Sequence, residues 1–443
     1  MSRPTKVLIS VVGNPEGYRE AVYHYGGHTV RSTFSSSVLL DAENPDRAVL
    51  VGQYTLAREG KDFGGLQEET IKYIKGCLDG ADRFTDFVIA PGVFTSRAGG
   101  RETAFRGDIY NFYAYVLYRL ADLFAGLRGD VEVVLDLTHG INYMGYMTMR
   151  AVSLVLDAYS TSYRAALKVV NSDPFPLGYS SRPSKCAARA DANYGPPPDL
   201  GLNVVLEVDV VPSFNYPIGR GSHVLRPSAA SSEEKARLGK ELEERFAGAR
   251  ACLAKYRYFV AAVNTGSLLA AFSFADDFGR CADAAVELFA SNVEVTGDKG
   301  SLAVVPKYSF TDSFESLVVA GLIREVVGIE GKAEVELDEL DEKAEIYRGK
   351  AVYSVVKNEV DSLRKMIGEG VQKDRGAATS WTPLTRYADL AGVKYSPDPD
   401  SRTFFAHAGM PYALVEAMGT KLRYRGDRLE RVKSLLIPPA RGT

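Results

Sequence analysis

Over the first 175 residues, short apolar runs alternate with segments of helical periodicity. Runs of β-branched and aliphatic residues predict five strands, and apolar side chains three and four positions apart predict three helices. The strands span residues 6–12, 48–52, 87–90, 131–137 and 167–171, and the helices span 65–78, 104–127 and 141–159. Because strands alternate with helices, the pattern indicates βαβ units and a Rossmann-like layer around a parallel sheet.

The pattern changes after residue 172. Prolines, including a triplet at residues 196–198, surround one strong apolar strand near residues 203–211. We expect this segment to be an edge strand or hairpin added to the first domain, so that this α/β domain covers residues 1–225. From residue 226 to 443 the spacing is helical, which predicts an all-α second domain. Its expected helices span residues 233–274, 282–291, 313–327, 335–367, 383–391, 403–418 and 422–436.

Composition narrows the class of protein. The chain has 443 residues, of which 46% are hydrophobic and 25% charged, which indicates a folded protein of two or three domains. Its formal net charge is −3, so a nucleic-acid partner would need a local basic patch. No segment suits a signal peptide or a membrane span. Four scattered cysteines argue against a zinc finger or a disulfide scaffold, and we expect a cytoplasmic protein.

Polar residues gather after two of the predicted strands. The first strand is followed by Gly13 and Asn14, and the strand at residues 131–137 by a second polar group. In parallel sheets, ligands bind outside the carboxyl ends of the strands, and a helix start there offers free N–H groups to a phosphate. The sequence therefore predicts a ligand site at this edge. Its candidate residues are Gly13, Asn14, Thr138, His139, Gly140 and Asn142. Ordinary strand–helix turns, with His139 as a capping or core residue, are the open alternative.

A second motif lies near the start of the predicted helix at 403–418. Arg402 and His407 are five residues apart, which on one helix separates their side chains by about 140°. Two such helices that meet across a twofold axis could line a shared cleft. Arginine binds phosphate there and histidine handles protons, as phosphodiester chemistry requires. The common alternative for so short a motif is a solvated arginine and a half-buried histidine.

A run of basic residues follows this motif. It forms either a solvated helix face or a surface that contacts an RNA backbone. Its members are Lys421, Arg423, Arg425, Arg428, Arg431 and Lys433.

Taken together, the two motifs resemble those of a known family. Asp136-x-Thr138-His139-Gly140 resembles the DxTHG signature of CRISPR-associated proteins, and Arg402-x4-His407 resembles the R-x(4–6)-H motif of HEPN ribonucleases. A Rossmann-like layer followed by an α domain with this motif is similar to the CARF–HEPN ribonucleases of type III CRISPR systems, in their archaeal DxTHG branch. The chain departs from many members at Thr403, where they carry Asn, Asp or His.

The resemblance implies a homodimer or a higher oligomer whose paired CARF domains bind a cyclic oligoadenylate, most often cyclic tetra-adenylate in this branch. The six residues at the strand ends would face this activator. Binding would switch on an endoribonuclease that cuts single-stranded RNA with Arg402 and His407, needs no metal or other cofactor, and leaves cyclic phosphate and 5′-hydroxyl ends. Whether the CARF domain also degrades its activator stays open.

One alternative comes from another class of protein. Residues 384–393 have the small-residue turn of a helix-turn-helix, which fits a ligand-sensing transcription regulator that binds duplex DNA. A recognition helix should expose polar residues, whereas the apolar Phe404, Phe405 and Ala406 follow here.

Overall fold

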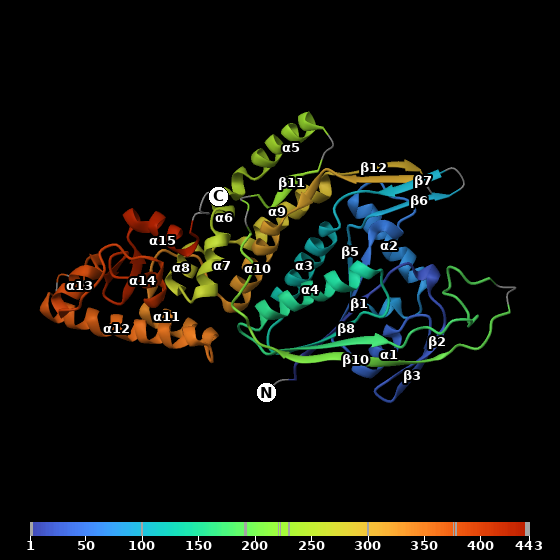
Figure 1. Ribbon diagram of the computed structural model, residues 1–443, viewed down its shortest axis with the longest axis horizontal. Helices are drawn as coiled ribbons and strands as arrows, with labels where there is room; N and C mark the ends of the chain where they lie inside the picture. Colours follow the sequence, from blue (N-terminus) through green and yellow to red (C-terminus); the bar gives the residue numbers. More distant parts are fainter. Residues whose placement is uncertain are drawn as a thin grey trace. The chain divides into compact units, whose positions relative to one another are not determined.

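The computed structural model divides the chain into two compact units (Figure 1). The described residues are 3–98, 101–189, 193–219, 221, 223–228, 231–298, 301–374, 376 and 379–438. The first unit comprises residues 1–211, 223–247 and 283–314, and the second comprises residues 212–222, 248–282 and 315–443. Each unit is therefore assembled from separate stretches of chain, whereas the sequence analysis expects two continuous domains that meet after residue 225.

The first unit is built on a mixed sheet of eight strands in the order β3-β2-β10-β9-β8-β1-β4-β5. The five strands expected from the apolar runs all form and pair in parallel. They are β1 (Thr5–Val11), β4 (Arg47–Gln53), β5 (Asp86–Ala90), β8 (Val131–Asp136) and β9 (Ala165–Ser172). The expected parallel sheet is thus confirmed as the centre of a larger mixed one.

The order of the parallel strands reverses at β1. The chain first places β4 and β5 on one side of β1, then returns to place β8 and β9 on the other. The carboxyl ends of β1 and β8 therefore flank the switch point, where open α/β sheets bind ligands. The helices between the strands are α1 (Ser36–Glu43), α2 (Phe63–Cys77), α3 (Tyr110–Ala125) and α4 (Asn142–Tyr159), of which α3 and α4 lie side by side (Figure 1).

The strand expected near 203–211 is β10 (Asp199–Val210), which pairs antiparallel with β9. At residues 199–201 it also pairs with β2 (Ala21–Tyr25), which forms a hairpin with β3 (His28–Ser32). The sheet thus continues past β10 over this short stretch. Polar and exposed residues interrupt the apolar pattern of β2 and β3, so that pattern does not predict this hairpin.

A second sheet in this unit has the order β12-β13-β7-β6. The hairpins β6 (Phe94–Ala98)–β7 (Arg101–Phe105) and β12 (Val293–Asp298)–β13 (Ser301–Pro306) meet where β7 and β13 pair in parallel. The helix expected from residue 104 therefore begins only at Tyr110. Pairing between segments about 200 residues apart leaves no local pattern. The unit is completed by β11 (Leu225–Pro227), β14 (Tyr308–Phe310) and α5 (Ser232–Arg245).

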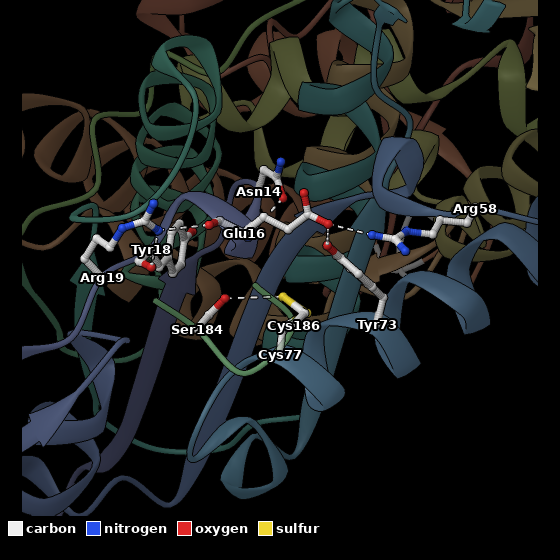
Figure 2. The surroundings of a disulfide bond; sticks show 9 residues. All are labelled: Asn14, Glu16, Tyr18, Arg19, Arg58, Tyr73, Cys77, Ser184 and Cys186. Carbon is white, nitrogen blue, oxygen red and sulfur yellow. Dashed lines mark hydrogen bonds and ion pairs between the residues drawn. A yellow bond between two sulfur atoms is a disulfide. The ribbon is translucent and has the colours of Figure 1, made fainter. Parts of the chain in front are cut away.

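The four cysteines, whose scatter argued against a disulfide scaffold, form two disulfides. Cys77 forms a disulfide with Cys186 across 109 residues of sequence, and Cys252 forms one with Cys281. Cys77 is the last residue of α2, and Cys186 lies in the proline-rich segment before β10 (Figure 2). Spacing could not predict these pairs because proximity arises only when the chain folds.

The second unit is mainly helical, but the expectation of an all-α domain is wrong. Its four-stranded antiparallel sheet has the order β15-β18-β17-β16, with β15 (Val335–Glu336), β16 (Thr382–Pro383), β17 (Val415–Met418) and β18 (Lys421–Tyr424). Gly419, whose φ is +60°, lies in the tight turn between β17 and β18. This hairpin interrupts the helices expected at 403–418 and 422–436.

The helices of this unit follow the remaining periodic segments. They are α6 (Arg250–Leu253), α7 (Tyr256–Thr265), α8 (Leu268–Phe274), α11 (Leu337–Lys343), α12 (Ala351–Lys373), α13 (Leu384–Ala391), α14 (Ser401–Ala406) and α15 (Leu429–Leu436). Two more, α9 (Phe278–Ser291) and α10 (Asp312–Val327), include residues of both units. Among the described residues, no helix is long and apolar enough to cross a membrane.

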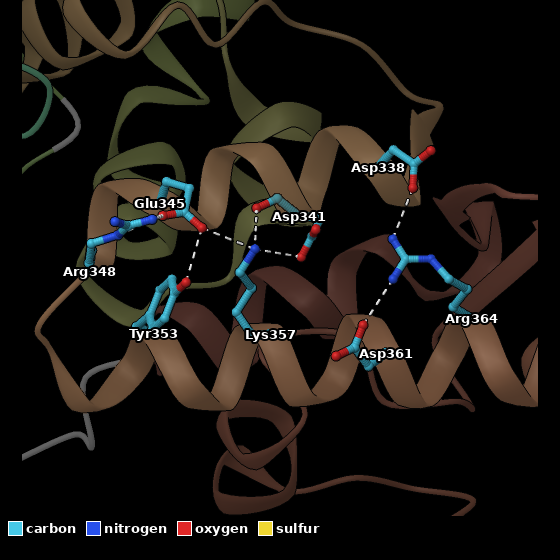
Figure 3. Close-up of polar contacts among 8 residues, drawn as sticks. All are labelled: Asp338, Asp341, Glu345, Arg348, Tyr353, Lys357, Asp361 and Arg364. Carbon is cyan, nitrogen blue, oxygen red and sulfur yellow. Dashed lines mark hydrogen bonds and ion pairs between the residues drawn. The ribbon is translucent and has the colours of Figure 1, made fainter.

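Ion pairs fasten α12 to the segment before it (Figure 3). The Nζ atom of Lys357 lies 2.8 Å from Asp341 Oδ1 on α11 and 3.1 Å from Glu345 Oε1, and Arg364 lies 2.9 Å from Asp338 Oδ1. Single exposed pairs contribute little to stability, but several along one helix hold its position along the neighbouring segment.

Candidate functional sites

The two strand-end loops of the first unit touch through their backbones. A Cβ atom on Gly13 would lie 3.3 Å from the Cα of Gly140, and one on Gly140 would lie 2.9 Å from Cγ1 of Val11. A larger residue at either position would push the loops apart. Gly13 and Gly140, both candidate ligand residues, thus allow the ends of β1 and β8 to lie close together.

Asp136, the last residue of β8, organises this edge. Its buried carboxylate accepts hydrogen bonds from the hydroxyls of Ser35 (2.7 Å) and Ser36 (2.6 Å), and from the backbone N–H of Thr138 (2.9 Å). One side chain thereby fixes the motif loop against the start of α1. Asp136 was not among the candidate ligand residues, and no local pattern indicates its hydroxyl partners, which lie about 100 residues earlier.

The ring of His139 is packed among aromatic side chains. It stacks on Tyr18 with ring centroids 4.2 Å apart, and Phe34 lies 5.5 Å away. The Nε2 atom accepts a hydrogen bond from the backbone N–H of Ser35 (3.1 Å), which requires the proton to sit on Nδ1. Burial lowers the pKa of His139 below its ordinary value, while Asp136 opposes the shift. His139 is therefore a neutral residue that holds the loop in place.

The other predicted ligand residues have mixed surroundings. Thr138 accepts a hydrogen bond from the backbone N–H of Ser172 at the end of β9 (3.1 Å). Asn14 is exposed, and its side-chain oxygen caps the following turn by accepting from the backbone N–H of Glu16 (3.1 Å). Asn142 begins α4, and its side chain lies outside the described residues.

Two cavities open beside these loops. One has a volume of about 330 Å³ and is lined by residues that include Gly13, Asn14, Gln53, Arg58 and Tyr73. The other, of about 450 Å³, is lined by residues that include Tyr18, Thr138, His139, Asn171 and Ser172. Of the predicted residues, Gly13 and Asn14 thus line the first cavity, and Thr138 and His139 line the second. Tyr18 links them, because it stacks on His139 while its hydroxyl accepts a hydrogen bond from the Gly13 N–H (2.7 Å).

A charged group in the first cavity was not predicted. Glu16 Oε1 lies 2.5 Å from Arg58 Nη2 and accepts a hydrogen bond from the Tyr73 hydroxyl at 2.8 Å (Figure 2). Arg58 follows β4 at the same edge of the sheet, so its position after a strand was the available signal. Among its described lining residues, the cavity has one cation, Arg58, which is already paired with the carboxylate of Glu16.

In the second unit, Arg402 and His407 lie at opposite ends of α14. Asp400 caps this helix by accepting a hydrogen bond from the backbone N–H of Thr403 (2.7 Å). The backbone and hydroxyl of Thr403 hold the pKa of Asp400 below its usual range. Arg402 is exposed and forms no ion pair within the described part of the chain. Thr403, where the chain departs from many family members, therefore helps to cap the start of α14 through its hydrogen bond to Asp400. The guanidinium of Arg402 faces solvent.

The helix ends at Ala406, before His407. Arg402 and His407 therefore do not lie on one continuous helix, in contrast to the expectation from the sequence. His407 is the C-cap, the N–H of Gly409 donates to the carbonyl of Phe404 (2.9 Å), and the N–H of Ala408 donates to that of Phe405 (3.1 Å). This is a Schellman motif. Its left-handed turn has φ of +48° at Ala408 and +80° at Gly409. A Cβ on Gly409 would come 2.7 Å from that of Ser267, so the turn is packed tightly below His407.

His407 is paired with a buried carboxylate. Its Nδ1 lies 3.0 Å from Oε2 of Glu359 on α12, and the side chain of Glu359 is only 9% exposed against 35% for His407. Tyr412 packs against the imidazole, with ring centroids 5.4 Å apart. The hydrogen bond that Nδ1–H of His407 donates to the Glu359 carboxylate raises the pKa of His407 above its ordinary value. Because Glu359 lies 48 residues before His407, spacing gave no signal for it.

Most of the basic run after the motif is engaged within the chain. Arg423 stacks on Trp381 at 3.9 Å and pairs with Glu416 at 2.6 Å. Four others have an acidic partner: Arg425 and Arg428 with Asp427, Arg431 with Asp398, and Lys433 with Glu430. An RNA backbone would have to compete with these carboxylates.

Among the described residues, the helix-turn-helix alternative lacks a recognition helix of ordinary length directly after α13. After α13 the chain turns at Gly392, and the next helix is α14, which has six residues and buries Phe404 completely. Within the described ranges, no cluster of three or more His, Cys, Asp or Glu side chains is close enough to hold a metal ion.

Two family models match the chain. One, described as the CARF domain of CRISPR system endoribonuclease Csx1, matches residues 7–174, and the other, described as the HEPN domain of the same endoribonuclease, matches residues 349–426. This chain belongs to the CRISPR-associated CARF–HEPN family. The CARF match includes both strand-end loops, and the HEPN match includes Glu359, Arg402 and His407.

A curated relative supports the same assignment. The CRISPR system endoribonuclease Csx1 of Methanocaldococcus jannaschii is 26% identical to this CARF–HEPN chain over 432 residues, which covers 93% of the chain and 86% of the relative. The similarity thus extends over both units.

Proposed function

We propose that this protein is an endoribonuclease that a cyclic oligoadenylate activates and that cuts single-stranded RNA without a metal ion. The observation that carries the proposal is the placement of Arg402 and His407 at the two ends of α14, with His407 paired to Glu359, inside the segment that matches a HEPN domain.

These residues fit one phosphodiester reaction. The 2′-hydroxyl of a ribose attacks the adjacent phosphorus, which leaves a cyclic phosphate and a 5′-hydroxyl. The solvent-facing guanidinium of Arg402 stabilises the charge that develops on the phosphate oxygens. His407 handles a proton at one of the two reacting oxygens. Because Arg402 lies in the first turn of α14 and His407 caps its other end, we propose that a homodimer supplies the complete cleft.

The sensing site is proposed at the switch point of the first unit. The neighbouring ends of β1 and β8, with their glycine contact and two cavities, suit an extended polar ligand. Cyclic oligoadenylates are the ligands that the CARF resemblance implies, with cyclic tetra-adenylate first. Binding activates only if the ligand binds the active arrangement more tightly than the resting one.

The test is incubation of the protein with labelled single-stranded RNA and each cyclic oligoadenylate in turn, with EDTA present. We expect one ring size to switch on cleavage, and the products to carry cyclic phosphate ends. Cleavage that needs added magnesium, or that proceeds on RNA with a 2′-deoxyribose at the cleaved position, would contradict the proposed chemistry.

A further inference from the structure

Glu359 lies where it can set both the orientation and the charge of His407. It comes from the third turn of α12, and its residue is only 7% exposed. Its Oε2 atom meets Nδ1 of His407 at 3.0 Å, while its Oε1 atom has no hydrogen-bond partner among the described residues. A buried carboxylate is costly unless it is paired, and all of its described hydrogen bonding goes to one imidazole.

The rest of α12 holds this carboxylate in place. Lys357 and Arg364 lie on either side of Glu359 in sequence, and both pair with acidic residues of the preceding segment (Figure 3). Below His407, the hydroxyl of buried Tyr424 donates to the carbonyl of Gly409 at 2.7 Å and fixes the turn. The backbone that carries Glu359 and the backbone that carries His407 are therefore both held in place by neighbouring contacts.

We infer that Glu359 is a positioning residue: it binds Nδ1 of His407 and keeps the imidazole charged, so that Nε2–H is the proton donor to the leaving oxygen. The inference rests on the proposed ribonuclease function. As the O2′–P bond forms and the P–O5′ bond breaks, the Nε2 proton passes to O5′ and the 2′-hydroxyl proton passes to water. His407 is left neutral and takes up a proton from solvent.

Among the described residues, Glu359 is the one charged group that acts on His407. Tyr412 packs on the ring, but burial raises its pKa, so it stays neutral. Asp400 at the far end of α14 is held by Thr403, and Arg431 of α15 pairs with Asp398. The carboxylate of Glu359 is thus the group that raises the pKa of His407.

The cleavage rate should depend on pH in a defined way. Because protonated His407 is the donor, cleavage falls as the pH rises through the raised pKa of His407. In Glu359→Gln the amide keeps a hydrogen-bonding group but not the charge. The alkaline fall should then move to lower pH by about one unit or more, the scale of one close opposite charge. Cleavage near neutral pH should drop about tenfold and recover at acidic pH.

The experiment measures cleavage of labelled RNA at saturating activator across pH for the unchanged protein, Glu359→Gln and Asp361→Asn. Asp361 lies on the same helix with a side chain 71% exposed, so its variant controls for loss of a carboxylate from α12. We expect only Glu359→Gln to move the alkaline fall. An unmoved fall, or an equal loss at every pH, would overturn the inference.

A second readout keeps the inference separate from the proposed function. The imidazole of His407 can be titrated by NMR in protein with labelled histidine, with His407→Asn to assign its signal. A pKa above the ordinary value that falls in Glu359→Gln supports the pair, and an unchanged pKa overturns it. Absence of cleavage in the unchanged protein would contradict the proposed function, while this titration would still judge the pair.

Discussion

The two motif histidines of this chain lie in opposite environments. His139 of the first unit is stacked on Tyr18, accepts a hydrogen bond from a backbone N–H, and has a pKa lowered by burial. His407 of the second unit is partly exposed, contacts the carboxylate of Glu359, and has a raised pKa. One is built to stay neutral and the other to carry charge.

This difference shows that a histidine in a motif has no fixed meaning. In the DxTHG loop, the carboxylate of Asp136 accepts hydrogen bonds from the hydroxyls of Ser35 and Ser36 and not from His139. His139 is therefore a packing residue that forms part of a cavity wall. In the R-x4-H segment, a carboxylate from a distant helix is dedicated to the ring. The comparison predicts that changes near His139 affect sensing, and changes near His407 affect the reaction.

The largest effect should come from the second unit. Arg402→Ala and His407→Ala should each lower activated RNA cleavage by about 10²-fold or more, because each removes a charge-stabilising or proton-transferring group. Binding of the activator should be unchanged. Arg386→Ala, which removes an exposed arginine of α13, serves as the control. Full cleavage by either motif variant would contradict the assignment of the reaction to Arg402 and His407.

Asp136→Ala should have the next largest effect. It leaves the buried hydroxyls of Ser35 and Ser36 and the N–H of Thr138 without their hydrogen-bond acceptor. This loss should lower the free energy of unfolding of the first unit by about 2–4 kcal/mol. The activator concentration for half-maximal cleavage should also rise. Denaturant titration and activation curves measure both. Asp41→Ala removes only a surface pair with Arg83 and should cost less than about 1 kcal/mol. Equal losses in the two variants would contradict this role of Asp136.

Substitutions of His139 and Asn142 in the loop after β8 should change sensing and not the chemical step. Asn142→Ala and His139→Ala should raise the half-maximal activator concentration by about tenfold, the equivalent of one lost polar contact, while cleavage at saturation stays unchanged. His139→Phe keeps the aromatic stack but loses the nitrogen acceptor, which separates packing from hydrogen bonding. A normal activation midpoint in both alanine variants would show that the activator binds elsewhere.

The smallest effect is on stability against pH. Because His139 has a lowered pKa in the folded protein, the unfolded chain binds more protons, and this residue makes the first unit less stable as the pH falls below about 6.5. The raised pKa of His407 acts in the opposite sense, and its stabilisation is lost as the pH rises through that value. In denaturant titrations across pH, His139→Phe should abolish the loss of stability at low pH, and Glu359→Gln should abolish the loss of stability at high pH. Parallel slopes in all three proteins would count against this assignment.

The sequence predicted those elements that depend on interactions between residues close together in the chain. The five parallel strands and the strand-end position of Gly13 and Thr138 follow from apolar runs and turn residues, and were confirmed as elements of the fold. It was insufficient where distant segments meet. Nothing near Cys77 indicates Cys186, and nothing near His407 indicates Glu359. The apolar residues after His407 have helical spacing, but the tight turn at Gly409 against Ser267 ends the helix instead.

The most direct test of the account measures, in one protein preparation, activator binding and activated RNA cleavage between about pH 5.5 and 8.5, where histidines change charge. With His139 neutral throughout, we predict an activator dissociation constant that stays constant over this range. With His407 required as the charged donor, we predict cleavage at saturating activator that falls on the alkaline side. Binding that varies with pH while cleavage stays constant would contradict the account.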